Sequence, residues 1–150
     1  MFQPKTILVP TDFSVFSERA LRKALDLSKA YSAKLVVLHV VRVLPVSVGD
    51  YWFDEPVIRR MQSDIERASR DEVEKFVKKF PQAEGIPVET DVRSGVPYEQ
   101  IVQDAADRGA DLIVMAPRGK TGIKEHLLGG TADRVIRHAA CDVLIVRDRD

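Results

Sequence analysis

The sequence holds little that would tie the protein to an oxidising compartment, a membrane or a nucleic acid. Its single cysteine, Cys141, cannot form an internal disulfide, which fits a reducing compartment. Lysine plus arginine equals aspartate plus glutamate, 23 each, without blocks of either sign, so no nucleic-acid or membrane-surface partner is expected. No apolar run approaches the roughly 18 residues of a membrane-spanning helix, and the first residues lack a signal-peptide pattern. We therefore expect a cytoplasmic protein folded as one domain, residues 1–150.

The sequence also lacks several familiar catalytic and phosphate-binding motifs. Residues 118–122 read RGKTG, but a Walker loop would need a glycine five positions before Gly119, where Val114 stands. The histidines and Cys141 do not have the spacing of zinc ligands, and no Ser-His-Asp or Cys-His arrangement can be argued from them. These absences exclude the Walker interpretation and disfavour zinc and nucleophilic chemistry.

Apolar runs rich in β-branched residues predict the strands of a parallel sheet. Four of them, at 7–10, 35–41, 112–116 and 143–146, are almost continuously apolar, as is typical of strands buried on both faces. A fifth, at 88–92, alternates apolar and polar residues and reads as an exposed edge strand. His39, inside the second run, is expected to be a satisfied core histidine.

Helical patterns separate these runs, at 17–31, 56–80, 98–108 and 131–139. The alternation of strands and helices predicts a doubly wound α/β domain with helices on both faces of the sheet. Residues 42–56 are too long for an ordinary connection and are interpreted as a mobile flap. The aromatic residues at 51–53 within it are expected to cover an edge of the core rather than to stack on a base.

Right-handed crossovers then give a five-stranded parallel sheet of order 3-2-1-4-5, a Rossmann-like arrangement that leaves the polar third strand at an edge. The switch point falls between strands 1 and 4, and open α/β sheets bind ligands beyond the carboxyl ends of such strands. Strand 1 ends in PTDFS (10–14) and strand 4 in MAPRGKTG (115–122). These two loops are expected to meet at one crevice.

A glycine-rich loop leading into a helix is suited to binding phosphate, because the first backbone N–H groups of a helix have no internal partner. Gly129 and Gly130 would let the backbone approach a phosphate, and Thr131 could cap the helix and present a hydroxyl. Positive charge nearby comes from Arg118, Lys120 and Lys124. Glycines that serve only tight turns are an equally open interpretation.

Asp12, at the end of strand 1, has three interpretations. It could cap the next helix, although that helix could also begin at Ser14 or Ser17. A phosphate-accepting aspartate of a receiver domain would follow strand 3 and need a lysine after strand 5, and neither condition holds. The third interpretation is an acceptor for a purine amino group or a ribose hydroxyl. Capping and ligand binding both stay open on this evidence.

Three stretches together resemble the universal stress protein family over nearly the whole chain. They are PTDFS (10–14), LHVV (38–41) and DLIVMAPRGKTGIKEHLLGGTADRVIRHAACDVLIVR (111–147). Members that bind ATP carry G-x2-G-x9-G-[ST] in the last stretch. Here Gly119 and Gly129 match the second and third glycines, Ala116 replaces the first, and Gly130 replaces the Ser/Thr, with Thr131 displaced by one.

The resemblance implies a set of nucleotide-binding residues. Asp12 and the backbone of Val40 would hold adenine, in a pocket lined by Pro10, Thr11 and Met115. Gly119, Gly129, Gly130 and Thr131 would surround the ribose and phosphates. The implied cofactor is ATP, accompanied by Mg²⁺ or Mn²⁺. Ala116 adds a methyl group and disfavours a positive φ, and Gly130 forgoes a hydroxyl bond of about 1 to 3 kcal/mol, so a weaker site is expected.

The resemblance favours an ATP-responsive regulatory or interaction module with unidentified protein partners. No catalytic residue is assigned, and at most slow ATP hydrolysis is expected, with Asp12 helping to place the metal. One alternative is a dimeric stress protein that binds no nucleotide and acts through protein contacts, which Ala116 and Gly130 favour. Another is an AMP-forming ligase or a flavin-linked enzyme, but TDFSVFSE (11–18) has no glycine for a phosphate loop.

The two predicted edge strands differ in a way that indicates assembly. The strand at 88–92 and its flank carry Glu89, Asp91 and Arg93, charges that discourage edge pairing, whereas 143–146 is uninterruptedly apolar. An apolar edge needs a cover, and the same strand of a second chain supplies one across a two-fold axis. A homodimer through residues 142–147 is therefore predicted.

Overall fold

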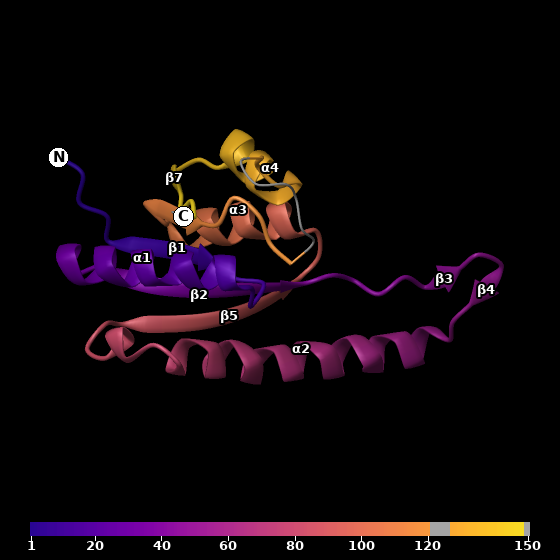
Figure 1. The fold of residues 1–150 in the computed structure, drawn as a ribbon. Helices are drawn as coiled ribbons and strands as arrows, with labels where there is room; N and C mark the ends of the chain where they lie inside the picture. Colours follow the sequence, from indigo (N-terminus) through magenta and orange to yellow (C-terminus); the bar gives the residue numbers. More distant parts are fainter. Residues whose placement is uncertain (121–126, 149–150) are drawn as a thin grey trace.

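The computed structural model describes residues 1–120 and 127–148, and these form a central parallel sheet flanked by helices (Figure 1). The five strands are β1 (Thr6–Pro10), β2 (Lys34–Val41), β5 (Val88–Ser94), β6 (Leu112–Met115) and β7 (Asp142–Ile145). They pair in the order β5-β2-β1-β6-β7, so the predicted order is confirmed. Leu8 of β1 lies in register between Val36 of β2 and Ile113 of β6.

Helices cover both faces of the sheet because its central strands are apolar on both. α1 (Val15–Tyr31) and α2 (Glu55–Lys78) cover one face, and α3 (Pro97–Arg108) and α4 (Gly130–His138) cover the other. Along β1, Ile7 and Val9 face α1 and α2 while Leu8 faces α3 and α4, and all three are fully buried. Each such side chain contributes about 1.5 to 3 kcal/mol of burial free energy.

Local signals explain where the helices begin and end. Ser14 is the N-cap of α1, and its Oγ accepts the N–H of Ser17 at 3.2 Å, so α1 begins two residues before the predicted start. Asp12 is therefore not the cap. Gly109, with φ of 60°, ends α3 in the left-handed conformation that glycine tolerates best. None of the described helices is both long and apolar enough to cross a membrane.

Residues 42–54 form an arm that extends beyond the sheet together with the first turns of α2 (Figure 1). It contains a small antiparallel hairpin, β3 (Ser47–Val48) and β4 (Tyr51–Trp52). Tyr51 and Trp52 are 80% and 79% exposed and Phe53 is 48% exposed. The expectation that these aromatic residues cover the core is wrong, because the arm leaves the sheet instead of folding back over it. Its mobility stays a prediction.

The β5 edge is bound to α3 by a network of charged side chains. Asp104 of α3 is fully buried, and its Oδ1 accepts from Arg108 Nε at 2.8 Å and from Arg93 Nη2 at 2.9 Å. Arg108 also reaches Glu89 at 2.7 Å and Asp91 at 2.9 Å on β5. The charges predicted for this edge are therefore paired across it, which fixes the position of α3 over the sheet.

The β7 edge is apolar and partly open. Val143 and Ile145 pack against the core under α3 and α4, while Leu144 is 37% exposed. After the strand, Val146 N–H donates to Met115 O at 2.9 Å, and Asp148 pairs with Arg118 at 2.9 Å. These two contacts hold the residues after β7 beside the carboxyl end of β6.

Candidate functional site

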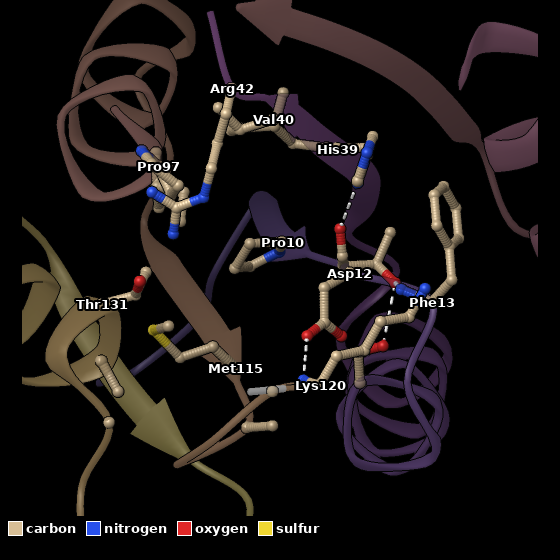
Figure 2. A pocket seen from close by; sticks show the side chains of 18 of the residues that line it. Pro10, Asp12, Phe13, His39, Val40, Arg42, Pro97, Met115, Lys120 and Thr131 are labelled. Atoms are coloured by element: carbon tan, nitrogen blue, oxygen red, sulfur yellow. Dashed lines mark hydrogen bonds between the residues drawn. The ribbon is translucent and has the colours of Figure 1, made fainter. Parts of the chain in front are cut away.

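A cavity of about 490 Å³ opens at the carboxyl ends of β1, β2 and β6, where the switch point was predicted (Figure 2). Every residue named from the resemblance lines it: Pro10, Thr11, Asp12, Val40, Met115, Gly119, Gly129, Gly130 and Thr131. The structure thus brings together residues that lie up to 121 positions apart, from Pro10 to Thr131.

The turn after β1 sets the position of Asp12. Thr11 N–H donates to Leu38 O at 2.8 Å, and Phe13 N–H donates to Thr11 Oγ1 at 3.0 Å. Phe13 has a φ of 65°, a left-handed conformation that costs a bulky residue roughly 1 to 2 kcal/mol. Its ring is held 4.4 Å from that of His39 and 5.5 Å from that of Phe76. This packing fixes a strained turn whose tip carries Asp12 into the cavity.

Asp12 links the two loops that border the cavity. Its Oδ1 accepts the Ser14 N–H at 3.0 Å, and its Oδ2 accepts the Lys120 N–H at 2.8 Å. Partial burial raises the pKa of the Asp12 carboxyl, but the hydrogen bonds from Ser14 and Lys120 outweigh burial and hold that pKa below its ordinary value. Asp12 is therefore an anion near neutral pH and offers acceptors only.

Gly119 is required by this link, because a Cβ there would lie 2.0 Å from Asp12 Oδ2. No side chain could occupy that position without displacing the carboxylate. The second glycine of the family pattern therefore has a structural reason in this chain: it allows the backbone to pass against Asp12.

The first turn of α4 faces the cavity without a side-chain cap. Gly129 is the N-cap residue, its N–H donates to Pro117 O at 2.6 Å, and no side chain among the described residues accepts from the N–H groups that follow it. Gly130 and Thr131 begin the helix and line the cavity. The prediction that Thr131 caps α4 is wrong, because the helix starts one residue earlier. Uncapped N–H groups at the positive end of a helix form a ready site for an anion.

The two departures from the family pattern are mild in this geometry. Ala116 is 9% exposed and does not have a positive φ, so the backbone penalty expected for alanine does not arise. A Cβ at Gly130 would meet nothing within 4 Å, so a serine would fit there. What the chain lacks at this position is the hydroxyl alone.

The described cations that were expected near the phosphate site, Arg118 and Lys120, lie against other groups of the chain. Arg118 pairs with Asp148 at 2.9 Å and stacks 4.3 Å from the centre of the Phe16 ring. Lys120 Nζ lies 5.8 Å from the centre of the Phe13 ring. Lys124 lies outside the described residues. Arg118 is thus engaged in holding the chain end and α1.

His39 is satisfied, as predicted, but it lies at the cavity wall rather than in the core. Its Nδ1 is 2.7 Å from Thr11 O, and the side chain is half-buried. Because a carbonyl can only accept, Nδ1 carries the proton in this contact. The ring therefore supports the turn that holds Asp12.

Sequence reasoning missed the remaining walls of the cavity. They include Phe13, Arg42, three residues of α2 (Ile65, Ser69 and Glu72) and two of α3 (Pro97 and Ile101). Arg42 and Pro97 could have been found, since each directly follows a strand end or begins a helix at the switch-point rim. The α2 residues gave no signal, because a long arm of irregular structure separates that helix from β2.

Among residues 1–120 and 127–148, no group of three or more histidine, cysteine, aspartate or glutamate side chains is arranged to hold a metal ion. His126 lies outside that part of the chain.

The fold and the cavity together define a small α/β protein of the doubly wound, Rossmann-like class, with a glycine-bordered cavity at its switch point. The family profile named "Universal stress protein family" matches residues 4–147. The chain belongs to this family, and the family predicted from the sequence is confirmed.

Relatives and solved structures agree with the assignment. Universal stress protein MJ0531 of Methanocaldococcus jannaschii is 36% identical over 146 residues, which are 95% of this chain and 82% of that protein. Universal stress protein UspA from Lactobacillus plantarum is similar in structure, with a TM-score of 0.81 and 26% identity over 98% of this chain and 100% of that one. A universal stress protein solved in complex with cAMP has a TM-score of 0.60 and 27% identity, covering 97% and 98% of the two chains.

Proposed function

We propose that this protein is a cytoplasmic nucleotide-binding module of the stress response that binds ATP at the switch-point cavity. The observation that carries the proposal is the uncapped first turn of α4, which faces the same cavity as the ionised Asp12. The first feature suits phosphate and the second suits the hydroxyl or amino donors of a nucleoside. A family member that was solved in complex with cAMP supports nucleotide binding by this chain.

In this proposal the nucleoside lies against the ends of β1 and β2. Asp12 and the Val40 backbone hold the base and sugar side, with Pro10, Thr11 and Met115 as apolar walls. The N–H groups of Gly130 and Thr131 receive phosphate, and Gly119 and Gly129 keep the backbone close to it. Mg²⁺ or Mn²⁺ would enter on the phosphates of ATP, where it neutralises their charge.

The site favours binding over catalysis. Among the described lining residues the groups that could act as a base are Asp12, Glu72 and His39. Asp12 already accepts two backbone N–H groups, which lower its pKa and make it a poor base. We therefore propose a regulatory role in which bound ATP changes contacts with a partner protein, with hydrolysis at most slow.

Isothermal titration calorimetry with ATP, with and without Mg²⁺, tests this function. Wild-type protein should bind, and Asp12→Ala and Gly129→Val should each weaken binding by about tenfold or more through loss of an acceptor or blocked approach to phosphate. Circular dichroism and thermal melts would establish that both variants are folded. Unchanged affinity in both folded variants would remove this cavity as the nucleotide site.

A second candidate function is a dimer that acts through protein contacts without nucleotide. The missing hydroxyl at Gly130 and the apolar β7 edge favour it. Freshly purified protein that carries no nucleotide and fails to bind ATP, yet is dimeric, would support this candidate over the first. Nucleotide released on denaturation and identified by chromatography would exclude it.

A further inference from the structure

Arg42 brings a positive charge into the cavity that the family pattern does not contain. It directly follows β2, lines the cavity, and extends its side chain into it towards the side on which Pro97 and Thr131 lie (Figure 2). Within the described chain its guanidinium has no carboxylate at ion-pair distance, in contrast to Arg93, Arg108 and Arg118. The charge is therefore available to a ligand.

The backbone on both sides of Arg42 is fixed by neighbouring elements. Val41 O accepts the Gly95 N–H at 2.9 Å, and Leu44 N–H donates to Gln62 Oε1 at 3.0 Å. Gln62 Nε2 also lies 3.5 Å from Arg42 O, so one α2 side chain spans the peptide groups around the arginine. The backbone at Arg42 is thus held by the sheet and by α2.

Two helices begin at the cavity on the side that Arg42 faces. The first turns of both α3 and α4 border the cavity, and their N-cap residues, Val96 and Gly129, make no side-chain cap. The positive ends of two helix dipoles therefore meet near the guanidinium. Among the described lining residues the carboxylates are Asp12, bound to the opposite loop, and Glu72, on α2. An anion between these groups would relieve their mutual repulsion.

We propose that Arg42 contacts a phosphate of the bound nucleotide and makes the pocket prefer phosphorylated nucleosides over the nucleoside. This inference rests on the proposed function of the same cavity. A guanidinium presents several N–H donors in one plane, and it forms strong paired hydrogen bonds with phosphate oxygens. Together with the α4 N–H groups it would hold the phosphate from two sides, which explains how the site can tolerate the absence of a serine hydroxyl at Gly130.

Calorimetric affinities for ATP, AMP and adenosine, measured for wild type, Arg42→Gln and Arg42→Lys, test the proposal. Arg42→Gln should weaken ATP binding about tenfold, the effect of losing one charge-assisted hydrogen bond, and leave adenosine binding unchanged. Arg42→Lys should fall between the two, because it keeps the charge but not the planar donors. Arg60→Gln, an exposed α2 arginine that does not line the cavity, is the matched control and should match wild type.

Gln62 is the positioning residue in this arrangement, and a double-mutant cycle separates its role from general stability. Gln62→Ala should weaken ATP binding about threefold when Arg42 is present and have no further effect in the Arg42→Gln background. Equal effects of Gln62→Ala in both backgrounds would show that it does not act through Arg42.

The calorimetric results distinguish failure of the Arg42–phosphate contact from failure of the nucleotide site as a whole. If wild type binds ATP and adenosine equally well, or if Arg42→Gln weakens both by the same factor, the phosphate contact is wrong and the nucleotide site survives. If wild type binds neither, the proposed function fails and this inference fails with it. A loss confined to ATP and AMP supports Arg42 as the phosphate contact.

Discussion

Asp12 and Gly119 depend on each other at the scale of single residues. The carboxylate can bridge the two loops because Gly119 leaves room for it, and the Lys120 N–H that follows completes the bridge. A glycine selected by a sequence pattern for phosphate binding thus also serves the residue that is expected to contact the nucleoside. Ligand binding and loop structure are therefore coupled through one side chain.

Gly119→Ala should lower both stability and nucleotide affinity. Its Cβ would lie 2.0 Å from Asp12 Oδ2, so the carboxylate must turn away and give up the Lys120 N–H. The expected loss of unfolding free energy is about 1.5 to 3 kcal/mol, measured by urea denaturation. Gly130→Ala is the matched control, since a Cβ there meets nothing within 4 Å. Equal losses in the two variants would contradict the bridge.

Gly130→Ser should tighten ATP binding. The position faces the cavity, and the structure has room for the side chain. A serine hydroxyl in the first turn of α4 could donate to phosphate, which corresponds to about a tenfold gain in calorimetric affinity. Gly130→Ala again serves as the control without a hydroxyl. Clear weakening by serine would show that phosphate approaches α4 along another path.

The family resemblance predicted which residues meet at the cavity but not how each one acts. All nine site residues lie along one cavity because strand order alone brings the β1 and β6 ends together. The cap of α4 was placed at Thr131, but Gly129 holds it, since a cap depends on where the loop pulls away from the helix. The left-handed Phe13 was also invisible, because packing on His39 and Phe76 is what stabilises it.

At the scale of elements, β5 and α3 are joined mainly by charge. Glu89 on the strand meets Arg108 on the helix at 2.7 Å and Lys34 on β2 at 2.5 Å. Hydrogen bonds from Arg108 and then Lys34 lower the pKa of the Glu89 carboxyl to about 2. The edge strand is thus held to its neighbours on both sides by an ionised group.

The contribution of Glu89 to stability should disappear in acid. Because its folded pKa lies below the unfolded value, the contribution is complete above about pH 4.5 and is lost as the pH falls towards about 2. Glu89→Gln should therefore be less stable than wild type at pH 6, by under about 1 kcal/mol for so exposed a pair, and this difference should shrink as the pH falls towards about 2. Urea unfolding at both pH values measures this. Glu74→Gln, at an exposed position on α2, should show no such convergence.

Helices and strands were predicted well where their periodicity is strong, and poorly where an irregular segment intervenes. The predicted helix at 56–80 is observed as Glu55–Lys78, yet its contribution to the cavity through Ile65, Ser69 and Glu72 could not be foreseen. Which face of α2 reaches the pocket depends on the path of residues 42–54, and that arm has no repeating pattern. The position of Arg42, at the start of the arm, could not be predicted for the same reason.

At the scale of the whole molecule, the two edge strands of the sheet differ in how they can pair with another chain. β5 pairs its charges within the chain, whereas β7 leaves Leu144 37% exposed beside the half-buried Val143 and Ile145. Exposed apolar edge strands are prone to pair with another strand. We therefore expect two copies to join antiparallel through residues 142–147, across a two-fold axis.

Leu144→Lys should convert the dimer to a monomer. It places a charge on the outward side of β7, whereas a lysine at Ile145 would enter the core under α3 and α4. Sedimentation velocity over low to high micromolar concentrations measures the change. Met61→Lys, which alters a 48% exposed apolar residue on α2, is the control and should stay dimeric. Wild type that is monomeric throughout, or dissociation by Met61→Lys alone, would contradict the β7 interface.

The first turns of α2 extend beyond the sheet, and this implies that the two halves of the helix unfold locally at very different rates. Its second half buries Ser69, Val73 and Phe76, while its first half leaves Val57 and Met61 about half exposed. Backbone amides in the first half should therefore exchange with deuterium by local fraying, and those near Val73 only through much larger openings. Hydrogen-exchange mass spectrometry should resolve the boundary close to Ile65, the first α2 residue at the cavity. Any molecule that fills the cavity would then slow exchange around this boundary and lengthen the protected part of the helix.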